Sequence, residues 1–598
     1  MRVADYIMSR LHEAGIDHIF MVTGRGALFL TDAVAKHPGL EAVCVHHEQS
    51  AAFAAVSYAQ QKGHAGACLV STGCASTNTI TGVLSAWQDG VPCVFISGQN
   101  TLQETSRHTG IPVRTYGQQE ADIVALVAPI TKYATMLQSA GDIVQVMDEA
   151  LRQAHSGRKG PVWIDVPLDL QSAQIYPLEA PAVPSVASPA ERGLPAPCAD
   201  DVASVRQALA QALRPVVLIG SGVQSAGARS GLQDFVEARG LPLVYAASAS
   251  DTYGTAHPLS IGSVGAMGCS RAGNFAVQNA DLVLVLGSRL SSLTTGPDFC
   301  KFARAAQVMV VDLDAVEHSK VGIRIDRLVV ADVGQFIAAL HEPDAPSVNP
   351  QWLARCQHWK QIFGQVEPAF AAQDRVDLYQ LAEALSKALP SESTLLTDSG
   401  LAEVILPTNV RFGPGMRCIH PVSQGAMGFA LPAAIGAYVA RQQTTVAVIG
   451  DGSIMMNLQE LESIRHRQLP IKILVINNNV YSIIRRRQQD LFRKRTIGTD
   501  PDNGVSCPDF AKVADCFGLD YLRIDSPQEL DDGLLRVMAH PGRLICEIMG
   551  RVDQGYIEVA HTRSEIDKRA VRRPLEDQSP FLDRELFRSE MLVDPIDQ

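Results

Sequence analysis

Short apolar runs alternate with helical patterns along most of this chain. The clearest runs occupy residues 67–70, 216–219, 282–286, 308–311, 446–449 and 471–476. Runs that are apolar at every position, rather than at alternate positions, are typical of strands in parallel sheets that helices cover on both faces. The pattern therefore predicts an α/β fold built from doubly wound parallel sheets.

Two proline-rich segments divide this pattern into three blocks. Six prolines lie between Pro177 and Pro197, and a second break covers residues 341–350. Proline clusters interrupt helices and strands, so both segments are expected to be linkers. The charged tail is expected to be solvated or partly disordered. The predicted order is a first domain (1–175), a linker (176–199), a central domain (200–340), a linker (341–374), a third domain (375–560) and a tail (561–598).

Glycine-rich turns follow several of the predicted strands, for example at residues 23–26, 71–73, 220–222 and 450–452. In open parallel sheets, ligands bind at the carboxyl ends of the strands, so a cofactor is expected at such turns. Gly24 and Thr72 are candidate cofactor-binding residues on this ground.

The turn after residue 449 carries the strongest chemical signal. Gly450, Asp451, Gly452 and Ser453 follow one predicted strand, and Asn478 lies 27 positions after Asp451, at the end of the next strand. This spacing fits a loop, a helix and a strand, and it places a carboxylate beside an amide oxygen. Mg²⁺ prefers such ligands and leaves its other positions to phosphate and water.

The same turn suits a diphosphate. Glycines let the backbone approach phosphate groups, and a helix after Ser453 would direct its positive end at them. Each motif alone is a common turn or loop, so the pairing carries the prediction. The sequence therefore predicts a site for a metal-bridged diphosphate.

Composition narrows the classes of function. The chain has 598 residues, 19% of them charged, and a formal net charge of −12. This balance disfavours a nucleic-acid partner, because counterion release needs clustered Lys and Arg. No run of about eighteen apolar residues suits a membrane span, and Asp5 interrupts any signal peptide. The 12 cysteines form no Cys-x-x-Cys pair and are expected to be free thiols. A cytoplasmic enzyme of small molecules is expected.

Longer stretches extend the signal over all three blocks, at residues 45–49, 77–79, 117–120, 160–167, 425–437 and 450–479. Together they resemble the thiamine diphosphate (ThDP) enzymes, in the acetolactate synthase-like group. The resemblance implies a pyrimidine-binding domain, a central domain and a diphosphate-binding domain. It also implies a homodimer or homotetramer with active sites shared between two subunits.

The resemblance assigns roles to individual residues of the cofactor site. Asp451, Asn478 and the backbone carbonyl of Val480 match the metal–diphosphate anchor. Glu48 matches the glutamate that hydrogen-bonds the aminopyrimidine ring and so helps the cofactor remove its own C2 proton. Met427 matches the apolar residue that holds the cofactor bent. Without the resemblance, Glu48 is interpreted as a surface acid and Met427 as a core residue.

The resemblance also implies the chemistry. A 2-keto acid, expected to be pyruvate, would lose carbon dioxide and leave a nucleophilic enamine. Members of the group differ in what this enamine meets: a proton, dioxygen, phosphate or a second carbonyl. Gln119 matches an active-site glutamine beside the reacting carbon, although an ordinary loop residue is the alternative.

Positions on the acceptor side depart from acetolactate synthase, in which an arginine of a Phe-Asp-Asp-Arg run and a downstream tryptophan recognise a keto-acid acceptor. Here Leu293 replaces the arginine, Arg487 the tryptophan, and Gln118 a phenylalanine. Losing a charge-assisted partner for a carboxylate removes about 1.5–3 kcal/mol, so a small keto acid should be a poor acceptor. Leu401 and Ala402 also replace a Gln-His pair near the diphosphate.

Arg485, Arg486 and Arg487 favour an anionic acceptor, because guanidinium groups suit phosphate; a solvated helix face is the alternative. Carboligases of branched-chain sugar biosynthesis, which act on nucleotide-sugar ketones, fit these departures. The leading hypothesis is carboligation of pyruvate with a ketone, giving a tertiary alcohol. Acetolactate synthase proper, a pyruvate oxidase-like enzyme, a cyclic-diketone hydrolase and a catalytically silent nucleotide-binding subunit are the alternatives.

The middle block raises the question of FAD. The FAD-binding positions of acetolactate synthase are matched by Gly265, Gly287, Arg289, Asp312 and Asp332. A degenerate central domain could keep these residues as structural turns. If FAD binds, its role is expected to be structural.

Overall fold

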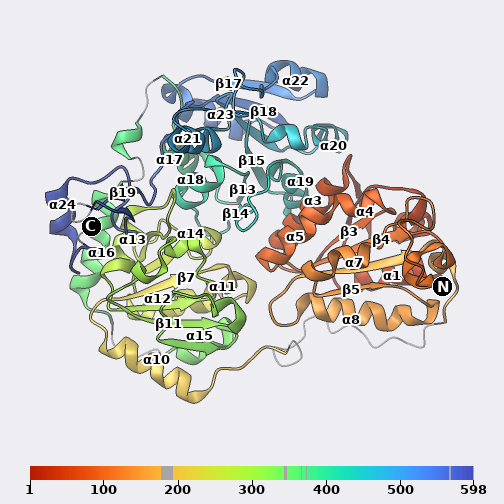
Figure 1. Ribbon diagram of the computed structural model, residues 1–598, viewed down its shortest axis with the longest axis horizontal. Helices are drawn as coiled ribbons and strands as arrows, with labels where there is room; N and C mark the ends of the chain where they lie inside the picture. Colours follow the sequence, from red (N-terminus) through yellow and green to blue (C-terminus); the bar gives the residue numbers. More distant parts are fainter. Residues whose placement is uncertain (177–192, 343–346, 365–366, 372–373, 565–567, 597–598) are drawn as a thin grey trace.

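The computed structural model describes all residues of the chain except 177–192, 343–346, 365–366, 372–373, 565–567 and 597–598. Three six-stranded parallel sheets follow one another along the chain (Figure 1), as the apolar runs predicted. Every run predicted to be a strand forms one, because each is buried along most of its length. All twelve cysteines are free.

The first sheet has the strand order β2-β1-β3-β4-β6-β5. Its strands are β1 (His18–Met21), β2 (Glu41–Cys44), β3 (Gly66–Val70), β4 (Cys93–Gln99), β5 (Tyr133–Met136) and β6 (Pro161–Pro167). Its main helices are α1 (Val3–Glu13), α2 (Leu28–Lys36), α3 (Glu48–Lys62), α4 (Cys74–Asn78), α5 (Ile80–Asp89), α7 (Ile123–Val127) and α8 (Ile143–His155).

The second sheet has the order β12-β11-β10-β7-β8-β9. Its strands are β7 (Pro215–Ile219), β8 (Leu243–Tyr245), β9 (Ser260–Ser263), β10 (Leu282–Leu286), β11 (Gln307–Asp312) and β12 (Arg327–Val330). Its helices include α10 (Ala199–Gln211), α11 (Ser221–Ser225), α12 (Arg229–Arg239), α13 (Arg271–Asn279), α14 (Ser292–Thr295) and α15 (Val333–Leu340).

The third sheet has the order β14-β13-β15-β16-β18-β17. Its strands are β13 (Ser393–Thr397), β14 (Arg417–Ile419), β15 (Thr444–Gly450), β16 (Lys472–Asn477), β17 (Asp520–Ile524) and β18 (Leu544–Met549). Its helices are α17 (Leu378–Ala388), α18 (Leu401–Asn409), α19 (Ala430–Arg441), α20 (Glu460–His466), α21 (Ser482–Leu491), α22 (Phe510–Phe517) and α23 (Leu530–Ala539).

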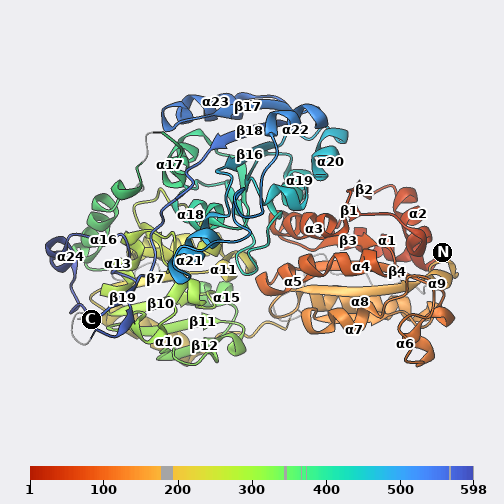
Figure 2. The same cartoon turned by 45° about the horizontal axis from the view of Figure 1, so that its top comes forward.

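Helices α3 and α19 join the first and third domains and lie side by side (Figure 2). Their backbones approach closely, since a Cβ atom added at Gly436 would lie 2.0 Å from the carbonyl oxygen of Ala54. Phe53 packs edge-on against Phe429, with ring centroids 5.2 Å apart. The two domains therefore share one hydrophobic core, which sets their relative placement within the chain.

The segment predicted as the second linker instead contains a helix, α16 (Pro350–Ile362). Trp352, Cys356 and Trp359 are buried in the core of the central domain, and Trp352 Nε1 donates to the carbonyl oxygen of Pro215 at 2.9 Å. Proline at position 350 lies in the first turn of the helix, where a missing N–H is tolerated. Pro350, the last residue of the proline-rich break, therefore begins a helix.

Part of the tail is packed: residues 574–578 are buried, whereas Arg563, Lys568 and Arg569 of the charged stretch are exposed and residues 565–567 lie outside the described residues. The tail forms β19 (His561–Arg563), β20 (Ala570–Arg572) and α24 (Arg584–Glu590), which lie beside α13 and α16 at the blue end of Figure 1. Glu576 and Gln578 are buried there, and Gln578 accepts a hydrogen bond from Asn274 at 2.9 Å. Composition could not reveal this, because a charged segment is solvated only when no partner neutralises it.

Among the described residues, no helix combines the length and the apolar character that crossing a membrane requires.

Candidate active site

Asp451 and Asn478 lie side by side at the carboxyl ends of β15 and β16, as their spacing predicted. The two strands are parallel neighbours, with Gly450 opposite Ile476. Asp451 Oδ2 accepts hydrogen bonds from the backbone N–H groups of Asn478 at 3.0 Å and Asn479 at 2.5 Å. The carboxylate is thus held in one orientation by the end of the neighbouring strand.

These residues fit a divalent cation. Asp451 is 3% exposed, and it forms no ion pair with any described residue. Burial raises the pKa of its carboxyl group, since an uncompensated charge is costly there. The side-chain amide nitrogen of Asn478 donates to Ser482 Oγ at 2.7 Å, so the amide oxygen of Asn478 points away from Ser482. One carboxylate, one amide oxygen and the carbonyl of Val480 would suit Mg²⁺, which completes its shell with phosphate and water.

The turn around Asp451 is packed tightly against its surroundings. A Cβ atom at Gly452 would lie 2.0 Å from the ring of Tyr481, whereas a Cβ atom at Gly450 would meet only Ser453, at 3.8 Å. Ser453 Oγ donates to Asp398 Oδ1 at 2.9 Å. Gly452 therefore has a packing reason to be glycine, and Gly450 leaves open space beside the carboxylate.

The helix expected after Ser453 does not begin directly at this residue. A single 3-10 turn (Ile454–Met456) follows, and α20 begins only at Glu460. The buried Asn457 lies between this turn and α20. Its side-chain amide nitrogen donates to the carbonyl oxygen of Gly428 at 2.9 Å and to Gln49 Oε1 at 3.2 Å. This asparagine thereby connects the start of α3 to the loop that contains Met427.

Met427 lies on a turn between two glycines with positive φ, Gly425 (60°) and Gly428 (78°). It is half-buried, unlike a core methionine. Asp398, whose pKa burial raises to about 7, accepts hydrogen bonds from the N–H groups of Gly428 and Ala430. Asp398 therefore links the Met427 turn to Ser453. Sequence patterns did not single out Asp398, so this role was missed.

Glu48 begins α3 in the first domain and is half-buried. Its Oε2 accepts a hydrogen bond from Asn78 Nδ2 at 2.9 Å. Asn78 ends α4, which follows the glycine-rich turn after β3. Asn78 therefore orients the Glu48 carboxylate.

Gln119 lies on a strained loop beside that turn. It has φ = 62°, and a Cβ atom at Gly73 would lie 1.9 Å from its carbonyl oxygen. The neighbouring Gln118 accepts a hydrogen bond from Arg25 at 2.5 Å, and the side chains of both glutamines are exposed. Left-handed backbone at a non-glycine residue costs about 1–3 kcal/mol and is concentrated at functional sites.

Gly24 and Thr72 meet the neighbouring turns at the same edge of the sheet. A Cβ atom at Gly24 would lie 2.5 Å from the side chain of Ser71, and Thr72 Oγ1 donates to the carbonyl oxygen of Gly98 at 3.1 Å. Both residues therefore hold the strand-end turns together.

The three arginines of α21 have acidic partners within the chain. Arg486 and Arg487 both bind Glu558, at 2.6 and 2.9 Å, and Arg485 lies 3.3 Å from Asp500. Arg485 also lies 3.2 Å from Asp553. The sequence pattern of three adjacent arginines did not indicate these carboxylates, which neutralise most of the cluster.

Leu293 lies on the short helix α14 and is 50% exposed. Its carbonyl oxygen accepts a hydrogen bond from the N–H of Ala266 at 2.7 Å. An apolar side chain thus stands where the resemblance places a guanidinium.

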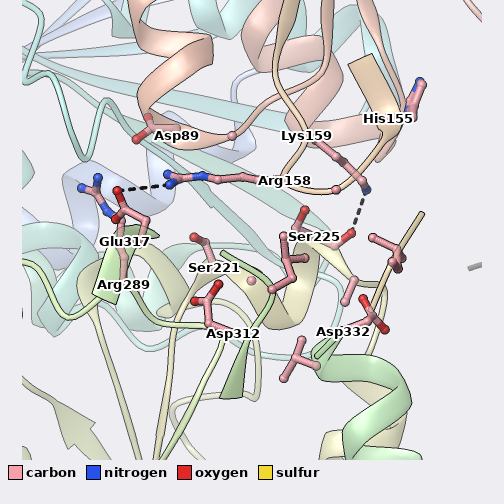
Figure 3. A pocket seen from close by; sticks show the side chains of 18 residues that line it. Asp89, His155, Arg158, Lys159, Ser221, Ser225, Arg289, Asp312, Glu317 and Asp332 are labelled. Atoms are coloured by element: carbon pink, nitrogen blue, oxygen red, sulfur yellow. Dashed lines mark hydrogen bonds and ion pairs between the residues drawn. The ribbon is translucent and has the colours of Figure 1, made fainter. Parts of the chain in front are cut away.

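A cavity of about 110 Å³ between the first and central domains contains most of the candidate FAD residues (Figure 3). It is lined by Gly287, Arg289, Asp312 and Asp332. Gly265 does not line it; a Cβ atom there would lie 2.6 Å from the carbonyl oxygen of Leu293. The cavity thus brings together four of the five residues predicted to bind FAD.

Arg158 also lines this cavity, and sequence reasoning missed it. It lies 3.4 Å from Asp314 and 3.3 Å from Glu317, across the domain boundary (Figure 3). Arg289 lies beside Glu317 in Figure 3, and its Nη2 donates to Ser423 Oγ of the third domain at 2.9 Å. The position of Arg158, just before the matched stretch at 160–167, was the available signal.

Comparisons with known proteins agree with this arrangement. Residues 1–126 match the family model "Thiamine pyrophosphate enzyme, N-terminal TPP binding domain", residues 202–340 match the central domain of the same enzymes, and residues 398–548 match their C-terminal TPP binding domain.

Curated relatives match along nearly the whole chain. An acetolactate synthase of Arthrospira platensis is 30% identical, covering 91% of this chain and 93% of that protein. The acetolactate synthase isozyme 2 large subunit of Escherichia coli (strain K12) is 30% identical, covering 92% and 95%. The chain therefore belongs to the thiamine diphosphate enzyme family, in the group related to acetolactate synthase large subunits.

Proposed function

We propose that this protein is a ThDP- and Mg²⁺-dependent carboligase that decarboxylates a 2-keto acid, pyruvate in the first instance, and joins the resulting two-carbon unit to a ketone. The observation that carries the acceptor class is Leu293. An exposed apolar side chain at this position offers no charge-assisted bond to the carboxylate of a keto-acid acceptor. A ketone acceptor would give a tertiary alcohol.

The chain's own residues would hold the cofactor at both ends. Asp451, Asn478 and the carbonyl of Val480 would bind Mg²⁺ at the diphosphate, and the open space at Gly450 would receive phosphate oxygens. Glu48, oriented by Asn78, would hydrogen-bond the aminopyrimidine ring and stabilise its imino tautomer. When bound, ThDP would supply a thiazolium that acts as an electron sink for decarboxylation.

Met427 and Gln119 would act on either side of the reacting centre. The half-buried Met427 offers an apolar surface against which a cofactor could be held bent. The amide of Gln119, on its constrained backbone, would orient a carbonyl or hydroxyl group of the substrate. The exposure of Gln118 and Gln119 supports a homodimer or homotetramer in which a second copy covers them.

The chemistry of its wall supports a site for part of FAD at the cavity of Figure 3. Carboxylates such as Asp312 and Asp332 suit ribose hydroxyls, and Arg158 suits a diphosphate. No described residue pair near this cavity supplies a redox partner, so the proposed role of FAD is structural.

A nucleotide-sugar ketone is the first acceptor to test. The side chain of Arg487 is 41% exposed, and the resemblance matches it to an acceptor-side position, where a phosphate would have to compete with Glu558. Acetolactate synthesis is the second candidate, because the curated relatives carry that name.

The test is an incubation of the protein with pyruvate, ThDP and Mg²⁺ and one acceptor at a time, with products identified by mass. The proposal expects ligated product with ketones and little with 2-keto acids. Acetolactate as the main product would replace the proposal with the second candidate. Oxygen consumption with pyruvate alone would indicate an oxidase, and cleavage of a cyclic diketone without pyruvate would indicate a hydrolase.

A further inference from the structure

We propose that the cavity where the three domains meet binds a small phosphorylated anion. This cavity has a volume of about 310 Å³ and adjoins the cavity of Figure 3, with which it shares Asp89, Lys159 and Ser221. It does not include Glu48, Asp451 or Asn478 in its wall. The inference therefore does not depend on the proposed reaction.

All three domains contribute positive charge to the wall. The basic residues are Lys62 and Lys159 of the first domain, Arg229 of the central domain, and Arg417 and Arg441 of the third. Among the described residues that line the cavity, only Asp89 and Asp251 carry a carboxylate. A cavity lined mainly by one sign of charge concentrates ions of the opposite sign, here in a protein whose net charge is −12.

The geometry leaves this positive charge largely uncompensated. Arg417 is 7% exposed, and its Nε donates to Asp251 Oδ2 at 2.7 Å. Arg229 donates to the backbone carbonyl oxygens of Thr252 at 3.0 Å and of Asp251. One carboxylate therefore faces both guanidinium groups, because backbone carbonyls satisfy hydrogen bonds without neutralising a charge.

Arg441 is the least engaged of the three arginines. It is the last residue of α19 and lines the cavity, and its side chain forms no hydrogen bond or ion pair with any residue that the structure describes. Burial and the nearby guanidinium of Arg417 lower the pKa of both Arg441 and Arg229. An anion between these groups would relieve their mutual repulsion.

Phosphate matches this wall better than a carboxylate does. Several guanidinium groups converge from different elements, and a phosphate offers three oxygens to such forks. The wall also carries the hydroxyl groups of Ser221 and Ser248. The ligand could be a free phosphorylated metabolite or the phosphate portion of a dinucleotide that extends from the adjoining cavity.

The test uses the protein saturated with ThDP and Mg²⁺, so that the diphosphate anchor is filled. Inorganic phosphate is titrated by calorimetry and thermal unfolding, against sodium chloride at matched ionic strength. We expect a rise in Tm with phosphate that chloride does not give. In Arg441→Gln the Kd for phosphate should increase about tenfold, the loss of one charge-assisted bond.

Arg465→Gln is the matched control, because Arg465 is exposed, pairs with Glu462 and does not line the cavity. It should bind phosphate as the natural chain does. Arg229→Gln, a second cavity variant on another domain, should weaken binding as Arg441→Gln does. Absence of phosphate-specific stabilisation, or equal affinity in Arg441→Gln and Arg465→Gln, would overturn the proposal.

Repeating the titration with excess FAD distinguishes the two sources of the ligand. Loss of phosphate binding would support a site for the phosphate portion of a dinucleotide. Unchanged phosphate binding would support a site for a separate metabolite. Inactivity with pyruvate would contradict the proposed function alone and leave this measurement valid.

Discussion

Two arginine clusters in this protein differ in how far acidic side chains neutralise them. Arg485, Arg486 and Arg487 are adjacent in sequence, yet Glu558, Asp500 and Asp553 pair with them. The cluster at the domain junction comes from three separate segments, and among the described residues Asp251 is the one carboxylate that forms an ion pair with its arginines. A basic cluster thus stays available to a ligand where the fold brings fewer carboxylates to it than it has cations.

The same comparison applies to a buried negative charge, Asp451, whose substitution has the largest expected effect. It is buried and forms no ion pair with any described residue, so Asp451→Asn should remove the stabilisation by Mg²⁺ and ThDP and lower kcat/KM by more than the ~10–100-fold typical of an outer-shell metal partner. Thermal unfolding with and without Mg²⁺, and steady-state kinetics, measure both. If Mg²⁺ still raises the Tm of the variant as in the natural chain, Asp451 is not a ligand.

At the junction, Arg417→Gln removes the guanidinium that Asp251 neutralises. Breaking such a buried pair costs about 3–5 kcal/mol, because it leaves an unpaired charge. The free energy of unfolding in urea should fall by this amount. Arg375→Gln, at an exposed pair, serves as control and should change it by less than about 1 kcal/mol. Similar losses in both variants would contradict the contrast.

Asp398 tests a buried carboxylate that only hydrogen bonds hold. Burial raises its pKa to about 7, above the value of an unfolded chain, so its contribution to stability is complete at low pH and is lost as pH rises toward 7. Between pH 5 and 7 this loss should be about 2–3 kcal/mol. Asp398→Asn should lack this part of the pH dependence in urea unfolding; an unchanged slope would contradict it.

Glu558→Gln removes the carboxylate that pairs with Arg486 and Arg487, and so leaves these two arginines of α21 with little counter-charge, as at the domain junction. It frees Arg486 and Arg487, and should cost about 1–2 kcal/mol because both arginines are partly exposed. The variant should then bind additional phosphate near α21, measurable by calorimetry. If its phosphate binding equals that of the natural chain, neutralisation by Glu558 is not what makes this cluster unavailable.

Arg487→Ala carries the smallest effect and concerns the acceptor. Use of a phosphorylated ketone should fall a few-fold more than use of a neutral ketone, since only the former needs the guanidinium. Measuring kcat/KM for both acceptors gives the ratio. Equal losses would show that the cluster on α21 does not contact the acceptor's anionic group.

Sequence patterns predicted the parts of the site that are local along the chain. Asp451 and Asn478 were placed together because parallel neighbouring strands end at one edge. The missed residues, such as Arg158 and Asp398, act through partners far away in sequence. The packed tail was missed for the same reason, because its buried polar groups pair with α13, some 300 positions earlier.

By itself, the sequence determined the three α/β blocks, the positions of six of their strands, the family and the residues that match its cofactor site. Periodicity and strand-end motifs are local, and the apolar runs need only a covered sheet to form. The tertiary structure alone decided which charges are neutralised. Electrostatic energy depends on distance and burial rather than on sequence separation. The three adjacent arginines of α21, which are conspicuous in the sequence, are therefore paired with carboxylates. The basic residues that remain available come together from three domains only in the folded chain.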